Sequence, residues 1–251
     1  MPQTDKTNRQ LILAERPKGE PDANTLRLVE SPIPVPSAGQ MLLRTEYLSL
    51  DPYMRGRMSD APSYAAPVEI GGVMVGGTVA RVVTSNLDGF APGDWVLSFN
   101  GWQDYALSDG KGVTNLGQSP EHPSWALGVL GMPGFTAWAG LKQIGAPEPG
   151  ETIAVAAASI AGGPDKCAYA VKELGSQGPR FCRATRQGQP DGIDIYFENV
   201  GGKVLDAVIP LLNSFARVPV CGLVSYYDAT KLLADGPNPA QENQDAGLHH
   251  L

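Results

Sequence analysis

The chain has few cysteines and histidines, and neither type is clustered. Its 251 residues include three cysteines, Cys167, Cys182 and Cys221, with no CxxC pair, and three histidines, of which His249 and His250 stand next to the C-terminus. Zinc sites need Cys or His ligands at close spacing, so the sequence predicts no metal site. An odd number of cysteines without a disulfide pattern favours a reducing, cytoplasmic setting.

Long apolar runs and basic clusters are also missing. No run is long enough to span a bilayer, and the first ten residues, MPQTDKTNRQ, lack the apolar core of a signal peptide. The net charge is −7. An acidic chain without a basic cluster is a poor ligand for nucleic acid or for an anionic membrane, so we expect neither as a partner.

Glycine and proline, in contrast, are abundant. The chain has 30 glycines and 22 prolines, while 42% of its residues are hydrophobic. With so much apolar material the excess indicates many tight turns in a folded chain rather than disorder. The length suits one large domain or two modest ones, with enough residues for a sizeable core.

The first half of the sequence reads as short strands divided by turns. The predicted strands span 10–16, 25–31, 40–50, 71–83, 90–99 and 101–109. Strands at this spacing are typical of a small barrel or sandwich rather than of βαβ units.

The pattern changes near Ser124. Apolar residues follow helical spacing over 124–145, with Pro133 and Gly134 between two helical pieces. Beyond them we predict buried strands over 151–159, 192–202 and 216–227, and helices over 164–175 and 203–213, the last limited by Pro210. Strands that alternate with helices predict an open α/β sheet. The polar stretches 176–190 and 234–251 fit neither pattern and read as a loop and a tail.

Four strings resemble the zinc-free branch of the medium-chain dehydrogenase/reductases, and within it the NADPH-dependent curcumin and alkenal reductases with their prostaglandin reductase relatives. The strings are YLSLDPYMRGRMSD (47–60), VLGMPGFTAWAGL (129–141), DIYFENVGGKVLDAVIPLL (194–212) and PVCGLVSYY (219–227). The resemblance covers residues 8–175 and 191–231. Zinc-dependent relatives carry His and Glu where this chain has Gly72 and Val73.

The resemblance implies a fold of the α/β plus β class. A GroES-like β-barrel, the substrate and catalytic domain, is expected over 1–123. An incomplete Rossmann domain, a doubly wound parallel sheet that binds NADP, is expected over 124–233. An irregular tail would follow over 234–251. In this family the active cleft lies between the two domains.

The resemblance also implies a cofactor, NADPH, and a reaction, the reduction of the C=C bond of an α,β-unsaturated carbonyl compound. The residues that it assigns to the cofactor are Met132, Pro133, Thr136, Lys166, Asn199, Cys221, Gly222 and Tyr227. Lys166 is the implied ligand of the 2′-phosphate, since Gly162-Gly163 offers no carboxylate for an NAD ribose. An exposed helix lysine is the plainer alternative for Lys166, and a turn that caps the following helix is an equal alternative for Asn199.

On the substrate side the resemblance implies Tyr53, Arg55 and Tyr64, with Tyr53 and Arg55 in a loop that faces the cleft. Tyr64 and Tyr227 are the candidate catalytic residues, because the reaction needs a proton for the α-carbon from a tyrosine, a ribose hydroxyl or water. For Tyr64 an exposed loop tyrosine is the stronger alternative, and Tyr227 can equally be a surface tyrosine in a strand-end turn. The segment from Met132 to Thr136 can serve helix packing as well as the cofactor.

One stretch, AVAAASIAGGPDKC (154–167), is too short for the fold that it belongs to. It opens as a buried strand and reaches Gly162-Gly163 after only Ile160 and Ala161, whereas a crossover to a parallel strand takes at least about 10–12 residues. We therefore expect the glycine loop, its helix and most of the second strand to be absent. The chain is then either a reductase of this family or a non-catalytic remnant, with an exposed strand edge that can pair with a second copy as a homodimer.

Overall fold

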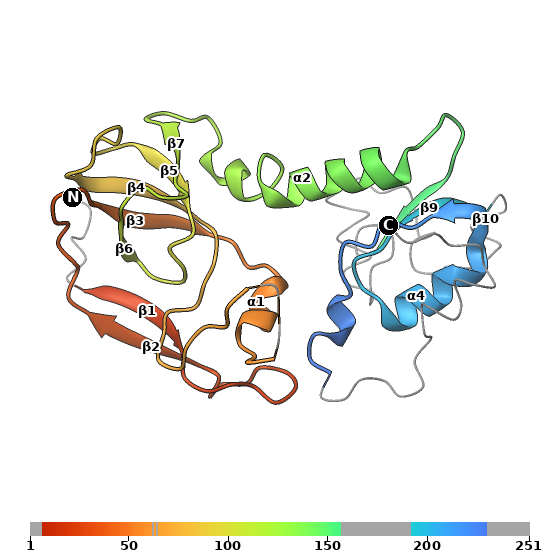
Figure 1. Cartoon of the computed structure of the whole chain (residues 1–251), viewed down its shortest axis with the longest axis horizontal. Helices are drawn as coiled ribbons and strands as arrows, with labels where there is room; N and C mark the ends of the chain where they lie inside the picture. The colour runs from red at the N-terminus through yellow and green to blue at the C-terminus, as the bar shows by residue number, and fades with distance from the viewer. Residues whose placement is uncertain (1–6, 62, 64, 157–191, 230–251) are drawn as a thin grey trace. The chain divides into compact units, whose positions relative to one another are not determined.

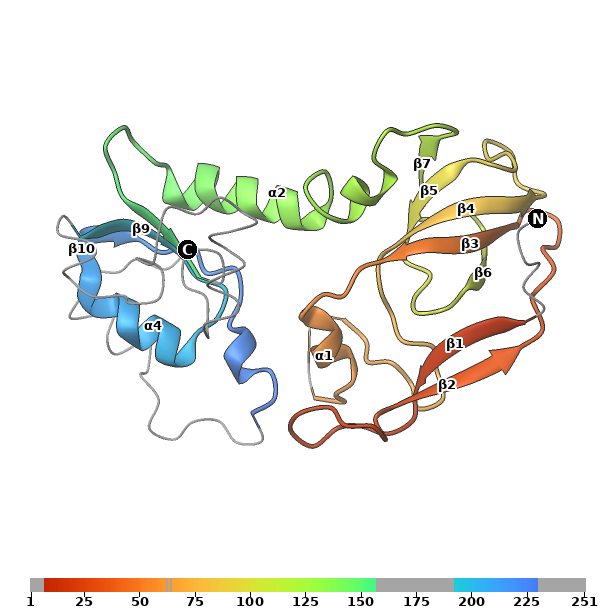
Figure 2. The same ribbon diagram turned by 180° about the vertical axis from the view of Figure 1, so that it is seen from behind.

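A computed structural model of the chain describes residues 7–61, 63, 65–156 and 192–229. The chain divides into two compact units, Met1–Phe135 and Thr136–Leu251, which are described separately below. Figure 1 shows them coloured along the chain, and Figure 2 shows the same ribbon from behind. The domain limits expected from the sequence stay a prediction.

The first unit is built on antiparallel strands. Strands β1 (Asn8–Leu13) and β2 (Leu26–Ser31) form a two-stranded sheet. A second sheet has the order β6-β3-β4-β5-β7. Its strands are β3 (Met41–Leu48), β4 (Thr78–Ser85), β5 (Trp95–Ser98), β6 (Tyr105–Ser108) and β7 (Thr114–Gly117). The six strands expected in this half are all present, although β4 begins only at Thr78, and β7 was not predicted.

Apolar side chains from both sheets fill the interior of this unit. One cluster lies on β3, β4 and β5, and consists of Met41, Leu43, Ala80, Val82 and Val96. A second cluster joins β1 to the segments that follow β3, and consists of Leu13, Met54, Met58, Val68 and Met74. The alternate residues of β3 share one face, as the pleat of a strand requires.

The expected loop after β3 is a short helix, α1 (Tyr53–Arg57). The prediction of a loop for Tyr53 and Arg55 was therefore wrong. The segment turns into a helix because Pro52 precedes it with a helical φ of −56° and Met54 is buried in the core, so both local geometry and packing favour the turn.

The helical segment near residue 130 also differs from expectation. A 3₁₀ turn, η1 (Pro123–Leu127), comes first, and α2 (Met132–Ala139) then passes directly into a π-helical stretch, η2 (Gly140–Gly145). Pro133 and Gly134 do not separate two helices. They lie in the first turn of α2, where proline is tolerated because that N–H has no partner within the helix.

The second unit holds a parallel sheet with the order β10-β9-β8. Its strands are β8 (Ile153–Val155), β9 (Ile193–Phe197) and β10 (Leu212–Arg217). Helix α4 (Gly202–Val208), extended by the 3₁₀ turn η4 (Ile209–Leu211), packs Val204, Leu205 and Val208 against Ala154 and Tyr196 of the sheet (Figure 1). The helix expected over 164–175 lies outside the described residues.

The third strand lies earlier than the sequence predicted. We expected it over 216–227, but β10 ends at Arg217. Pro219 has no N–H to give to a ladder, and pairing resumes beyond it only as an isolated bridge between Glu198 and Val220. Cys221 and Gly222 therefore lie in the segment that follows the sheet.

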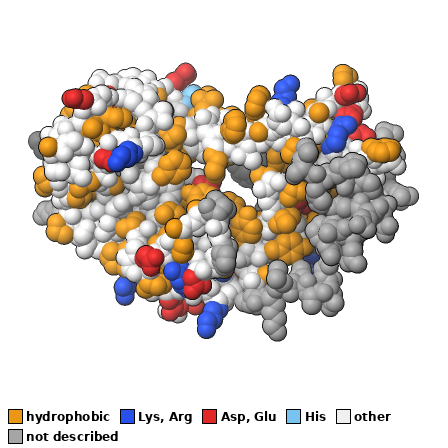
Figure 3. All heavy atoms as spheres, viewed as in Figure 1, with side chains coloured by type: hydrophobic (Ala, Val, Ile, Leu, Met, Phe, Trp, Pro, Cys, Tyr) orange, Lys and Arg blue, Asp and Glu red, His pale blue; other side chains and the backbone are white. Residues whose placement is uncertain are grey.

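The described parts thus combine an antiparallel β unit with a parallel sheet covered by a helix, which confirms the coarse class, β plus α/β. Acidic and basic side chains lie interspersed on the face drawn in Figure 3. Among the described residues no helix has the length and apolarity needed to cross a membrane.

Candidate active site

The best-defined group of candidate residues lies in the second unit, where the parallel strands end. Strand β9 runs into Glu198 and Asn199, and the segment after β10 brings Cys221 and Gly222 beside them. The carbonyl oxygen of Glu198 accepts hydrogen bonds from the N–H groups of Cys221 at 2.9 Å and Gly222 at 3.2 Å. In open α/β sheets, ligands bind at the carboxyl ends of the strands.

Asn199 links this group to the neighbouring strand. Its side-chain amide donates to the carbonyl oxygen of Ala156, next to β8, at 3.2 Å, and its own carbonyl oxygen accepts from the N–H of Val224 at 3.3 Å. A Cβ added to Gly222 would lie 3.5 Å from the Tyr227 hydroxyl and 3.7 Å from the Asn199 carbonyl oxygen. The structure therefore brings together Asn199, Cys221, Gly222 and Tyr227.

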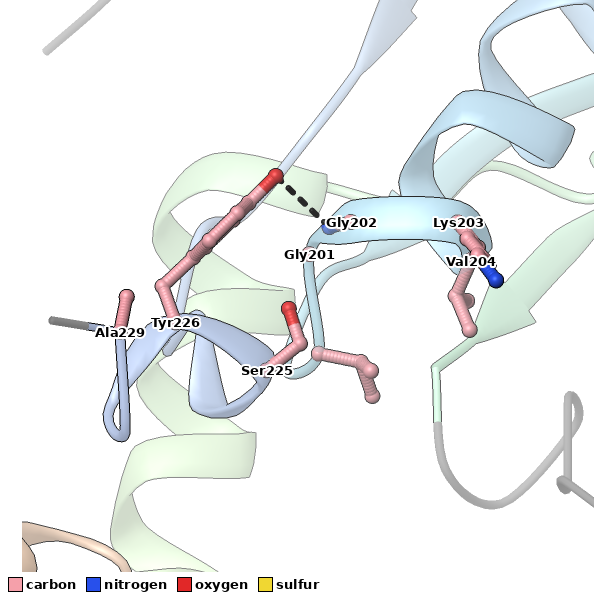
Figure 4. A pocket seen from close by; sticks show the side chains of 8 residues that line it. Gly201, Gly202, Lys203, Val204, Ser225, Tyr226 and Ala229 are labelled. Atoms are coloured by element: carbon pink, nitrogen blue, oxygen red, sulfur yellow. Dashed lines mark hydrogen bonds between the residues drawn. The ribbon is translucent and has the colours of Figure 1, made fainter. Parts of the chain in front are cut away.

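The turn after Asn199 is shaped by two glycines. Gly201 has a φ of 74°, in the region that favours glycine, and a Cβ there would lie 2.6 Å from the ring of Tyr226. The Tyr226 hydroxyl accepts the N–H of Gly202 at 3.0 Å (Figure 4). The N-cap of helix α4 is Gly201 and no side-chain hydrogen bond caps the helix, so Asn199 does not cap it with its side chain.

A shallow cavity of about 430 Å³ borders this turn. It is lined by Val200, Gly201, Gly202, Lys203, Val204, Ser225, Tyr226 and Ala229 (Figure 4). The neighbouring Cys221 is exposed, but desolvation by the surrounding protein raises the pKa of its thiol. It is therefore a protonated thiol near neutral pH rather than a reactive thiolate.

Sequence reasoning missed Glu198, the residue that organises this turn. Its side chain is 1% exposed and accepts three hydrogen bonds, from the N–H groups of Val200 and Gly201 and from the Tyr196 hydroxyl. Burial above all, and then the hydrogen bond to Glu198, raise the pKa of Tyr196, so this phenol stays neutral and donates. A carboxylate directly after the predicted buried strand that contains IDIYF was the signal that could have identified Glu198.

The substrate-side candidates lie in the first unit. Tyr53 packs half-buried against the cluster around Leu13 and Met54, and Arg55 donates to the carbonyl oxygen of Gly19 at 2.7 Å. Tyr64 lies outside the described residues. Among the described residues near it, the buried Arg57 donates to the Ala65 and Ala66 carbonyl oxygens and to the Ser63 hydroxyl.

The remaining candidates divide between α2 and the undescribed part of the chain. Met132 and Pro133 are exposed in the first turn of α2, and Thr136 follows half-buried. Lys166, with Gly162 and Gly163, lies outside the described residues. No group of three or more metal-binding side chains occurs in the part of the chain that the structure describes.

Comparison with known proteins places this geometry in a family. Residues 9–116 match a family described as the N-terminal domain of oxidoreductase. The NADPH-dependent curcumin reductase of Escherichia coli (strain K12) is 53% identical over 92% of this chain and 75% of its own length. The chain belongs to the medium-chain dehydrogenase/reductases. It falls in the branch that contains the curcumin, alkenal and prostaglandin reductases, which are oxidoreductases.

Two further relatives support this membership. Prostaglandin reductase 1 of Mus musculus is 35% identical over 88% of this chain and 74% of its own length. The crystal structure of CurA from Vibrio vulnificus in complex with NADPH is 50% identical, with a TM-score of 0.85, over 96% of this chain and 80% of that one.

The same comparison bears on the missing segment. The match to the Escherichia coli reductase runs over 258 positions, but 92% of 251 residues is about 231, so about 27 positions inside the match have no residue in this chain. That is close to the length of one βαβ unit, about 30 residues. An internal gap in the chain is thereby supported, while its place before Gly162 stays a prediction.

Proposed function

We propose that the protein uses NADPH to reduce the C=C bond of an α,β-unsaturated carbonyl compound. The observation that carries the proposal is the meeting of Asn199, Cys221, Gly222 and Tyr227 at the ends of three parallel strands, in a chain 53% identical to a curcumin reductase. The named relatives act on curcumin, alkenals or prostaglandins.

The described residues fit the nicotinamide and ribose end of this cofactor. Gly222 leaves room where a side chain would approach Tyr227 and Asn199. The carbonyl oxygen of the Asn199 side chain and the Tyr227 hydroxyl form no hydrogen bond with the residues that the structure describes, so both can bind a ligand. The phosphate end is assigned to Lys166 by family resemblance alone.

In this reaction the protein's own residues would bind the substrate and supply the proton. When bound, NADPH supplies a hydride for the β-carbon of the substrate. Negative charge then develops on the carbonyl oxygen, which needs a hydrogen-bond donor. A tyrosine O–H, from Tyr227 or Tyr64, donates the proton that the α-carbon requires, and water returns a proton to that tyrosine. Tyr53 and Arg55 border the substrate in this proposal.

Two structural statements belong to the same proposal. The first unit corresponds to a GroES-like barrel, supported by its antiparallel sheets, and the second to a partial Rossmann domain, supported by its parallel strands and helix α4. A homodimer would form by pairing of exposed strand edges, since unpaired backbone N–H and C=O groups at an edge favour such contacts.

The test is an absorbance assay with a simple enone. Because about 27 aligned positions are missing, the pyrophosphate contacts should be weakened, so NADPH is supplied at millimolar concentration. We expect loss of NADPH absorbance that depends on the enone. Absence of any enone-dependent loss would favour the non-catalytic remnant, which the comparisons with active reductases do not favour.

A further inference from the structure

Glu198 is a buried carboxylate directly after β9. Its side chain is 1% exposed, and it forms no ion pair with the residues that the structure describes. Burying a charge is costly unless hydrogen bonds replace the lost water. The free-energy cost of burying Glu198 at the end of a core strand therefore calls for an explanation of what the residue does there.

Hydrogen bonds occupy both oxygens of this carboxylate. Oε1 accepts from the N–H of Val200 at 2.5 Å and of Gly201 at 2.9 Å. Oε2 accepts from the Tyr196 hydroxyl at 2.8 Å. The side chain therefore folds over its own turn, where it holds the backbone that follows Asn199 and bonds the Tyr196 side chain that precedes it.

The backbone of the same residue joins the second segment of the site. Its N–H donates to the Pro219 carbonyl oxygen at 2.9 Å, and its carbonyl oxygen accepts from Cys221 and Gly222. The turn 198–202 and the segment 219–222 are thus tied together at one residue. Any movement of Glu198 would displace Asn199 on one side and Gly222 on the other.

We infer that Glu198 is the positioning residue of this site: its carboxylate holds the turn 198–202 in the one shape that presents Asn199 and Gly222 to a dinucleotide. The inference rests on the proposed function for the identity of the ligand. Its structural half, that Glu198 holds the shape of the turn 198–202, rests on the hydrogen bonds alone. A carboxylate suits the task because it offers two acceptor oxygens and no donor, which matches three converging donors.

The structural half is tested by amide hydrogen exchange on the 251-residue chain and its variants. In Glu198→Ala the exchange of Val200 and Gly201 should be faster by about tenfold or more, since each loses a charge-assisted hydrogen bond. Ile195 and Phe197, inside β9, should keep their protection, which shows that the sheet is still folded. Tyr196→Phe should leave Val200 and Gly201 protected.

A milder variant covers the case in which Glu198→Ala does not fold. Glu198→Gln keeps one carbonyl oxygen for the two backbone amides and should preserve most of their protection, whereas Glu198→Asp, one methylene shorter, should lose it. Equal protection of Val200 and Gly201 in the parent chain, Glu198→Ala and Glu198→Asp would overturn the inference.

The functional half uses steady-state kinetics. Glu198→Asp should raise the KM for NADPH by about tenfold and leave the KM for the enone unchanged. The matched control is Asp94→Asn in the first unit, where another buried carboxylate accepts from Ala91 and Asn115; it should leave the KM for NADPH unchanged.

The outcomes separate the two proposals. If the parent chain oxidises no NADPH, the proposed function fails while exchange still decides the role of Glu198 in the turn. If the parent chain is active and exchange at Val200 changes while the KM for NADPH does not, Glu198 is structural only and the inference is wrong.

Discussion

At the scale of single residues, the structure gives the candidates unequal support. The structure brings together four of the candidates, Asn199, Cys221, Gly222 and Tyr227. The local sequence pattern did not predict the contacts that join them. Arg55 is bound to the carbonyl oxygen of Gly19, so part of its role is to fix a loop of the first unit. The role proposed for each residue can therefore be tested by replacing one side chain at a time.

Tyr227→Phe tests the proton donor. The Tyr227 hydroxyl lies beside Gly222 and is 38% exposed as a residue, so its removal should not disturb packing. We expect kcat for enone reduction to fall by about tenfold to a hundredfold, with the KM for NADPH unchanged. Tyr47→Phe, at an exposed tyrosine of β3, is the control and should retain full activity. Undiminished kcat in Tyr227→Phe would assign the proton to Tyr64 or to water.

Lys166→Ala tests the choice of NADPH over NADH. Loss of a charge-assisted contact to the 2′-phosphate costs about 1.5–3 kcal/mol, or roughly ten- to a hundredfold in affinity. The KM for NADPH should rise by that factor, while the KM for NADH, which has no such phosphate, should stay the same. Equal weakening for both cofactors would remove the assignment.

At the scale of elements, the sequence predicted strand positions well where a proline soon follows a β-prone segment, as Pro17 follows β1, Pro32 follows β2 and Pro52 follows β3. It failed where a tertiary contact decided the conformation. Burial of Met54 favours a helix, α1, after β3. Pro219 ends the strand pairing that the sequence predicted over 216–227. Glu198 was not predicted because its partners become visible only when the backbone of the turn is known.

The turn between β9 and α4 can be tested by matched glycine substitutions. Gly201→Ala forces a side chain to a φ of 74°, with its Cβ 2.6 Å from the Tyr226 ring, and should destabilise the fold by about 2–3 kcal/mol in urea denaturation. Gly112→Ala has a similar φ of 68° but open space, and should cost about 1 kcal/mol. Equal costs would show that Tyr226 does not press on this turn.

An ion pair beside the parallel sheet of the second unit predicts that stability depends on pH. The hydrogen bond from Arg217, at 2.5 Å, lowers the pKa of Glu151, whose side chain precedes β8. A depressed pKa in the folded state adds stability above the unfolded value of about 4.3, and this stability is lost as pH falls below it. The melting temperature of Glu151→Gln should therefore lie below that of the parent chain at pH 7. The difference between the two melting temperatures should shrink as the pH falls from about 4.3 through the lowered pKa, and a difference that does not change between pH 7 and the acid limit of folding would contradict the linkage.

At the scale of the whole molecule, two units carry separate halves of the proposed chemistry. The family and the order of the units could be predicted from four strings, because those strings are specific. A missing segment could be predicted from the spacing before Gly162-Gly163, because two residues cannot form a crossover between parallel strands, and its position there stays a prediction.

The central claim is that this chain reduces a C=C bond with a hydride from NADPH, and isotope transfer tests it most directly. The chain is incubated with a simple enone and NADPH that carries two deuterons at C4 of the nicotinamide, and the product is examined by mass spectrometry and NMR. The account predicts a saturated ketone with one deuterium at the β-carbon and a solvent proton at the α-carbon. An allylic alcohol, with deuterium on the carbonyl carbon, or recovery of the unchanged enone would contradict it.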